Sequence, residues 1–211
     1  MKSTHQAAVL GVLLVIALGT GLFRGSITQT DLNTVPGVTL FGSGLAVDDF
    51  QFIDQHGNAV DKSSFKPGWR LVFFGYTFCP DICPTTLADL NRVWKKLSPQ
   101  AQQSVQVVFV SIDPERDTPE SLAPYLAYFN PEFMAMTGNV ASLERLAEQL
   151  NGFYARVERE DGMAYLMDHS SNLMLVDDSW QYRGYIEPPF KRDALVEAFE
   201  ILAESAASYE F

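Results

Sequence analysis

The sequence predicts a layered α/β domain, because apolar strands alternate with amphipathic helices along the chain. Residues 70–76 (RLVFFGY) and 105–112 (VQVVFVSI) are continuous apolar runs, which are typical of strands buried on both faces of a sheet. Between them, in residues 84–97, leucine, valine and tryptophan side chains recur at helical spacing. We therefore expect a central mixed sheet that is covered by helices.

The segment before the first buried strand is expected to form an N-terminal hairpin in residues 47–62. Phe50 and Phe52 alternate with polar residues, and residues 55–58 (QHGN) have the composition of a turn. The helix after the first buried strand is expected to begin at Pro84. A proline suits the first helical position, because its missing N–H would have no partner there.

The later elements follow from local composition. Thr118 and Pro119 are typical of a cap and a first helical residue. Asn139 is typical of a second cap, and Gly152 of a helix end. The expected elements are a helix over 119–129, a short strand over 133–136, a helix over 139–150, paired strands over 153–157 and 163–167, a hairpin of 172–176 with 181–186, and a helix over 190–204.

The N-terminal residues have the composition of a membrane anchor. Residues 7–23 (AAVLGVLLVIALGTGLF) carry no charge and are just long enough to cross a bilayer as a helix. We expect residues 1–6 in the cytoplasm, 7–23 as a transmembrane anchor, 24–44 as a linker and 45–211 as the folded domain outside the cytoplasm. A signal peptide cleaved after residues 17–19 (ALG) is the alternative.

Composition and charge exclude some classes of protein. Hydrophobic residues make up 47% of the chain and charged residues 19%, as in a folded domain and unlike a disordered chain. The net charge of −11 argues against nucleic acid as a partner, because an acidic surface repels phosphate groups. The two cysteines, Cys79 and Cys83, are too close in sequence for a disulfide to add much stability. They are therefore interpreted as reactive or metal-binding groups.

The cysteines lie at the turn from the first buried strand into the following helix, within residues 76–84 (YTFCPDICP). We expect Cys83 at the N-cap of that helix and Cys79 in the loop ahead of it. Backbone N–H groups and the helix dipole stabilise negative charge there, which lowers the pKa of a thiol. A dithiol at this turn, together with a hairpin before the last helix, resembles the thioredoxin fold.

The spacing of the cysteines bears on their chemistry. Three residues separate Cys79 from Cys83, whereas thioredoxin-like redox motifs have two. Two thiolates favour Cu(I) and tolerate zinc, but a structural zinc site usually has four ligands. One added imidazole would complete a trigonal Cu(I) site, whereas Cu(II) would require a fourth ligand.

Of the three histidines, His169 is the candidate third ligand. His5 precedes the apolar run and His56 lies in an expected turn. His169 lies just before the first strand of the C-terminal hairpin. In thioredoxin-like folds this place is beside the dithiol and normally carries a cis-proline, which is replaced here by an imidazole.

Three separated motifs carry a specific resemblance. They are YTFCPDICP at 76–84, DPERDTP at 113–119 and DHS at 168–170, and together they are similar to the SCO/SenC family over roughly residues 45–205. The resemblance implies that Cys79, Cys83 and His169 correspond to the family's copper ligands, with one copper per chain. It also implies an anchored protein with its domain outside the cytoplasm, which in a bacterium is the periplasmic side of the inner membrane.

The resemblance leaves two functions open. Family members are copper chaperones or thiol–disulfide reductants that help to assemble the dinuclear copper site of cytochrome c oxidase subunit II. A chaperone would receive copper from a donor protein or small carrier and would change no bond in a substrate, so it would not be an enzyme in the ordinary sense. A thiol–disulfide oxidoreductase would reduce the subunit's cysteines and would need both cysteines but not His169. The chaperone is the preferred interpretation.

The DPERDTP motif follows the end of a buried strand, where ligand sites gather in α/β sheets. Asp113 is therefore a candidate outer group that orients His169 or orders the loop of the cysteines. A simple capped turn is the alternative for Asp113. It is the preferred interpretation for residues 116–119, with Arg116 paired to a carboxylate.

Overall fold

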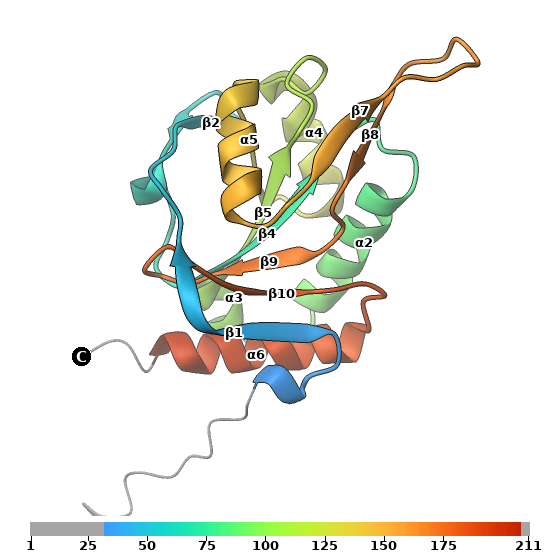
Figure 1. The fold of residues 1–211 in the computed structure, drawn as a ribbon. Helices are drawn as coiled ribbons and strands as arrows, with labels where there is room; N and C mark the ends of the chain where they lie inside the picture. The colour runs from blue at the N-terminus through green and yellow to red at the C-terminus, as the bar shows by residue number, and fades with distance from the viewer. Residues whose placement is uncertain (1–31, 208–211) are drawn as a thin grey trace, which may run out of the picture. The chain divides into compact units, whose positions relative to one another are not determined.

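The computed structural model describes residues 32–207, whose fold is shown in Figure 1. Its strands are β1 (Val38–Ala46), β2 (Phe52–Asp54), β3 (Ala59–Val60), β4 (Trp69–Gly75), β5 (Val105–Ser111), β6 (Met134–Thr137), β7 (Tyr154–Val157), β8 (Leu166–His169), β9 (Leu173–Val176) and β10 (Gln181–Ile186). Its helices are the 3-10 turns η1 (Leu32–Thr34) and η2 (Lys62–Ser64), and α2 (Ile82–Trp94), α3 (Pro99–Ser104), α4 (Pro119–Phe129), α5 (Val140–Gln149) and α6 (Arg192–Ala207).

The central sheet is mixed, as expected. Its eight strands have the order β1-β10-β9-β4-β5-β6-β2-β3. β4, β5 and β6 pair in parallel, and the other neighbours are antiparallel. The two apolar runs form β4 and β5, which lie in the middle of the sheet. Every residue of β4 is buried, as expected for a strand that helices cover on both faces.

Helices cover both faces of the sheet. Successive side chains of a strand point to opposite faces, so neighbouring residues of β5 show which helix lies on each face. In β5, Val108 lies with Leu146 of α5 around a small buried cavity. The next residue, Phe109, packs on Tyr125 of α4, with ring centroids 5.9 Å apart. α2 contacts both α4 and α6, so these three helices share the face opposite α5. Figure 1 shows α5 alone in front of the sheet.

The expected linker over 24–44 differs from the structure. Residues 32–34 form η1, and β1 adds an edge strand that pairs with β10 from Val38↔Ile186 to Ala46↔Gln181. The glycine-rich composition of 37–46 resembles a linker, but an edge strand needs only backbone pairing and one buried face. Among the described residues, 32–44 are therefore part of the folded unit rather than a linker.

Several boundaries shift from their expected places. The N-terminal hairpin is confirmed as β2 and β3, although both strands are short. α2 begins at Ile82, two residues before Pro84, which becomes its third residue. Proline is tolerated there because none of the first N–H groups of a helix has an intrahelical partner. The partner of β7 is residues 166–169 rather than the expected 163–167, so that Tyr154 pairs with His169.

Within residues 32–207, no helix has both the length and the apolar character needed to cross a bilayer. The expected anchor over 7–23 lies outside these residues.

Candidate metal centre

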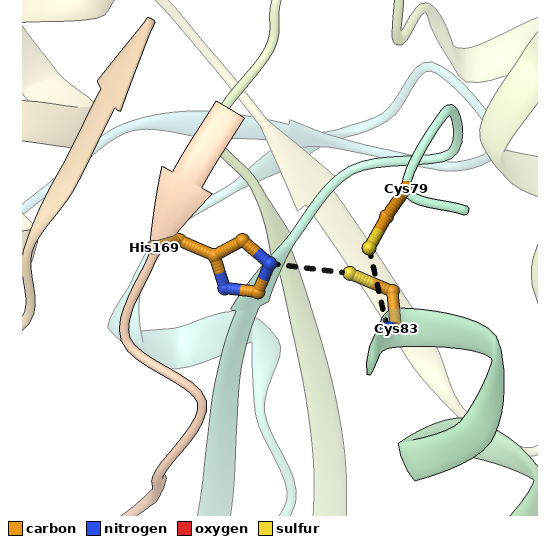
Figure 2. A group of neighbouring side chains, drawn as sticks. All are labelled: Cys79, Cys83 and His169. Atoms are coloured by element: carbon orange, nitrogen blue, oxygen red, sulfur yellow. Dashed lines mark hydrogen bonds between the residues drawn. The ribbon is translucent and has the colours of Figure 1, made fainter. Parts of the chain in front are cut away.

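The two cysteines lie where β4 leads into α2. Asp81 is the N-cap of α2, so Cys83 is the second helical residue rather than the expected N-cap. Cys79 lies in the preceding loop, with its N–H 3.3 Å from the carbonyl oxygen of Tyr76. The N–H of Cys83 points at the Sγ atom of Cys79 at 3.4 Å, as Figure 2 shows. An N–H group at the start of α2 thus stabilises negative charge on the sulfur of Cys79, which lies four residues earlier in the chain.

The two free thiols differ in exposure and in pKa. Cys83 is fully buried, and Cys79 is half-buried. The Cys83 thiol hydrogen-bonds to the Cys79 sulfur and lowers the pKa of Cys79 to about 3, with further help from His169 and from the N–H of Cys83. The same hydrogen bond and burial raise the pKa of Cys83. At neutral pH the metal-free pair is therefore one thiolate and one thiol.

His169 ends strand β8 and points at the dithiol (Figure 2). Its Nε2 atom lies 3.4 Å from the Sγ atom of Cys83, and its Nδ1 atom lies 3.0 Å from the carbonyl oxygen of Ser170. Because a carbonyl only accepts, Nδ1 carries a proton in this arrangement, and Nε2 is the ring nitrogen that faces the sulfurs. The rings of Phe73 and Tyr76 pack edge-on against the imidazole and hold its orientation.

The structure thus brings together the three residues that the sequence singles out. The Sγ atoms of Cys79 and Cys83 and a ring nitrogen of His169 all lie within 4.8 Å of one another. In the described part of the chain, this is the one group of at least three Cys, His, Asp or Glu side chains arranged closely enough to share an ion. Two soft thiolates and one imidazole are a donor set that fits copper.

Asp113 does not have the expected contact with His169 or with the cysteines among the hydrogen bonds of the described residues. Its carboxylate pairs with Arg116 and accepts from the hydroxyl of Tyr165 at 2.7 Å. The reason is position: Asp113 lies at the start of the turn before α4, where Arg116 folds back over it three residues later. The predicted pairing of Arg116 with a carboxylate is confirmed.

Asp117 is the residue that orders the loop of the cysteines, and sequence reasoning missed it. Its buried carboxylate accepts from the N–H of Thr77 at 2.9 Å, from the Thr77 hydroxyl, and from the Ser111 hydroxyl at 2.6 Å. Burial raises the pKa of Asp117, against the effect of these hydrogen bonds. The available signal was an acidic residue in the DPERDTP loop between a buried strand and the next helix, which did not indicate a partner 40 residues away.

The fold and the site define a thioredoxin-like protein whose dithiol faces a histidine. The chain belongs to the SCO1/SenC family, whose profile matches residues 42–204. The chain is 34% identical to the SCO2-like protein of Rickettsia felis over 184 residues, which cover 86% of this chain and 89% of that protein.

Two solved structures show the same fold with related sequences. One is Arabidopsis thaliana ScoI with copper bound, at 28% identity and a TM-score of 0.68, covering 78% of this chain and 100% of that one. The other is Bradyrhizobium japonicum ScoI with copper bound, at 32% identity and a TM-score of 0.65, covering 78% of this chain and 99% of that one.

Proposed function

We propose that this protein carries one copper ion on Cys79, Cys83 and His169 and delivers it to the dinuclear copper site of cytochrome c oxidase subunit II. The convergence of two sulfurs and one imidazole nitrogen within 4.8 Å carries the proposal. The copper-bound structures of two relatives support copper as the ion. The oxidase subunit is supported by the family to which the chain belongs.

The exposure of the ligands suits transfer by ligand exchange. Cys83 is fully buried, whereas Cys79 is half-buried and lies in a loop at the surface. An incoming acceptor thiolate would therefore replace Cys79 first, while Cys83 and His169 still hold the ion. A copper donor protein or small carrier would load the site by the reverse exchange.

The proposal includes an extracytoplasmic place for the domain. The uncharged run over 7–23 supports a membrane anchor, and the acceptor copper site of the oxidase requires a domain on the outer side of the membrane. In a bacterium this is the periplasmic side of the inner membrane.

Thiol–disulfide reduction is the second candidate, and the unequal thiols favour it. The Cys79 thiolate would attack a disulfide of the oxidase subunit and release one of its sulfurs as a thiolate. Cys83 would then lose its proton to that sulfur and attack Cys79, which releases the second sulfur. Two electrons pass to the subunit, and Cys79 and Cys83 end as a disulfide. This chemistry does not use His169.

The copper site is tested by metal analysis of residues 25–211 with reduced thiols and added copper. We expect one copper per chain in the wild type. Cys79→Ala, Cys83→Ala and His169→Ala should each lose it or bind it far more weakly, and His56→Ala, which alters a histidine in the β2–β3 turn, should bind as the wild type does. Copper binding of unchanged strength in His169→Ala would rule out the three-residue site.

Oxidase maturation separates the two candidates. In cells that lack this protein, we expect His169→Ala to fail as completely as Cys79→Ala in restoring oxidase activity. Restoration by His169→Ala, but not by Cys79→Ala, would assign thiol reduction instead. Added copper in the growth medium serves as a control, because it bypasses a missing carrier but not a missing reductant.

A further inference from the structure

His169 lies on a hairpin whose two strands do not belong to the central sheet. β7 and β8 pair with each other in a two-stranded sheet and with no strand of the central sheet. In Figure 1 this hairpin projects from the body of the domain. We name residues 154–169 the histidine hairpin. Backbone pairing with the central sheet does not fix its position, which therefore depends on side-chain contacts and on the short connections to α5 and β9. Phe73 and Tyr76 contact His169 itself, at the end of β8.

A second set of contacts, farther along the hairpin, comes from residues 113–118, which we name the clamp loop. The Nη1 atom of Arg116 donates to the carbonyl oxygen of Tyr165 at 2.9 Å, and the Tyr165 hydroxyl donates to Asp113 at 2.7 Å. Farther out, the guanidinium of Arg156 pairs with Glu115 at 3.0 Å. The clamp loop therefore forms hydrogen bonds with the histidine hairpin at Tyr165, one residue before β8 begins.

The Tyr165 ring contacts arginines of both segments, the clamp loop and the histidine hairpin. It lies between two guanidinium groups, with the Cζ atom of Arg116 at 3.6 Å and that of Arg156 at 3.7 Å from the ring centroid. Stacking of this kind stabilises a partly desolvated arginine beyond simple contact. Tyr165 precedes His169 by four residues, so a displacement of its ring moves the whole strand that ends in the imidazole.

Arg116 also contacts the side of the site that carries the cysteines. Its Cζ atom lies 4.9 Å from the ring centroid of Phe78, next to Cys79, and 5.6 Å from that of Tyr76. One residue on, Asp117 binds Thr77. The clamp loop therefore touches both parts of the site, although neither Asp113 nor Arg116 is a donor to the ion.

We propose that Arg116 is a positioning residue, which sets the separation of His169 from the two cysteines by holding Tyr165 and Phe78 against one guanidinium. The effect on copper binding rests on the proposed function. The effect on the mobility of the histidine hairpin does not, because it is measured in the metal-free protein. Removing the stacking should free the histidine hairpin, whereas the hydrogen bonds between Asp117 and Thr77 still order the loop of the cysteines.

Two variants test the inference from opposite sides. Arg116→Lys keeps the positive charge beside buried Asp113 but replaces the flat guanidinium that stacks on the rings. Tyr165→Leu leaves the Arg116–Asp113 pair intact and removes the ring from the hairpin. Arg159→Lys is the matched control, because Arg159 lies in the same hairpin and pairs with Asp161 rather than with the clamp loop.

The first readout is amide hydrogen exchange of the metal-free full chain. We expect faster exchange in residues 154–169 of Arg116→Lys and Tyr165→Leu, with β4 and β5 unchanged, and wild-type exchange in Arg159→Lys. The second readout is Cu(II) binding. We expect both variants to lose about 10–100-fold in affinity and to shift in spectrum toward His169→Ala.

Each outcome decides something different. Wild-type exchange in the hairpin of both variants would overturn the inference, and so would a copper spectrum that neither variant changes. If the wild-type protein binds no copper, the proposed function fails, while the exchange experiment still decides whether Arg116 holds the hairpin.

Discussion

The two sulfurs of the dithiol lie in different surroundings, although both belong to one short loop and helix start. Cys79 is half-buried and receives the N–H of Cys83, whereas Cys83 is fully buried and faces His169. The hydrogen bond from the Cys83 thiol lowers the pKa of Cys79 to about 3, and the pKa of Cys83 is raised. The metal-free protein thus presents one accessible thiolate and protects the second sulfur.

This difference predicts the pH dependence of alkylation. An ordinary thiol with a pKa near 8.5 is roughly one part in a thousand thiolate at about pH 5.5. Cys79 should still be almost fully ionised at that pH, since its pKa is about 3. We expect iodoacetamide to modify Cys79 nearly as fast at pH 5.5 as at pH 7.5, measured by peptide mass spectrometry, and to spare Cys83. A rate for Cys79 that falls as steeply as that of free cysteine would contradict the assignment.

Asp117 is a buried acceptor of hydrogen bonds, and its charge is a cost to the fold. Because burial raises its pKa, the cost is present above the folded-state pKa and is relieved as the pH falls. Asp117→Asn keeps an oxygen for the Thr77 N–H, so the free energy of unfolding should change by less than about 1 kcal/mol. Asp117→Ala leaves that N–H and the Ser111 hydroxyl without an acceptor and should cost roughly 1–3 kcal/mol.

Denaturant unfolding measures both Asp117 variants. Asp193→Ala is the control, since its side chain is 96% exposed and pairs with Lys96 at the surface. We expect this control to stay within about 0.5 kcal/mol of the wild type. If Asp117→Asn proves as destabilising as Asp117→Ala, the negative charge itself matters and the account of Asp117 is wrong.

At the scale of elements, the site depends on how closely β4 approaches the start of α2. Gly75 ends β4, and a Cβ atom there would lie 2.9 Å from the Cys83 Sγ atom and 2.6 Å from the ring of Phe109. Both neighbours are fully buried, so neither can move aside easily. The absent side chain therefore provides the space that the Cys83 sulfur occupies.

Gly75→Ala should thus damage both stability and the site. We expect the free energy of unfolding to fall by about 1–3 kcal/mol through overpacking, and copper affinity to fall with it as the sulfur is displaced. Gly42→Ala in β1 is the matched control, because a Cβ atom there meets no atom within 4 Å. Equal stability of the two variants, measured by denaturant unfolding, would show that the space beside Cys83 is not tight.

At the scale of the whole molecule, residues 32–44 complete the sheet and its core. Leu32, Val35 and Val38 are each less than 10% exposed, and β1 covers the edge of β10. Burial of three such side chains stabilises the fold by at least about 4 kcal/mol. A chain of residues 45–211 would lose this contribution and expose the edge of β10 to other molecules.

We therefore expect residues 45–211 to unfold at a much lower temperature than residues 25–211, and to associate at high concentration. Thermal unfolding and size-exclusion chromatography test this directly. An equal melting temperature for the two chains would mean that β1 and η1 add nothing to the domain.

Much of the fold was predictable because burial leaves a periodic signal. The continuous apolar runs gave β4 and β5, and the spacing of Leu87, Leu90 and Val93 gave α2. β1 left no such signal, since its composition is that of a linker and its order comes from pairing with β10. The short polar helix α3 was missed for a similar reason: its Ser98 cap and Pro99 start enclose only six residues.

The site was predictable only in its reactive groups. Thiols and imidazoles are few in this chain, so their positions in the expected fold were enough to bring Cys79, Cys83 and His169 together. The groups that hold them in place join distant segments, as Thr77 with Asp117 across 40 residues and Arg116 with Tyr165 across 49. Neither periodicity nor composition indicates such pairs, because each partner alone resembles an ordinary polar surface residue.

The central claim is that His169 completes the copper site, and X-ray absorption at the copper edge tests it most directly. The wild-type domain loaded with Cu(I) should show two sulfur ligands and one nitrogen ligand, and His169→Ala should show sulfur ligands without that nitrogen. Identical spectra from the two proteins would contradict the claim.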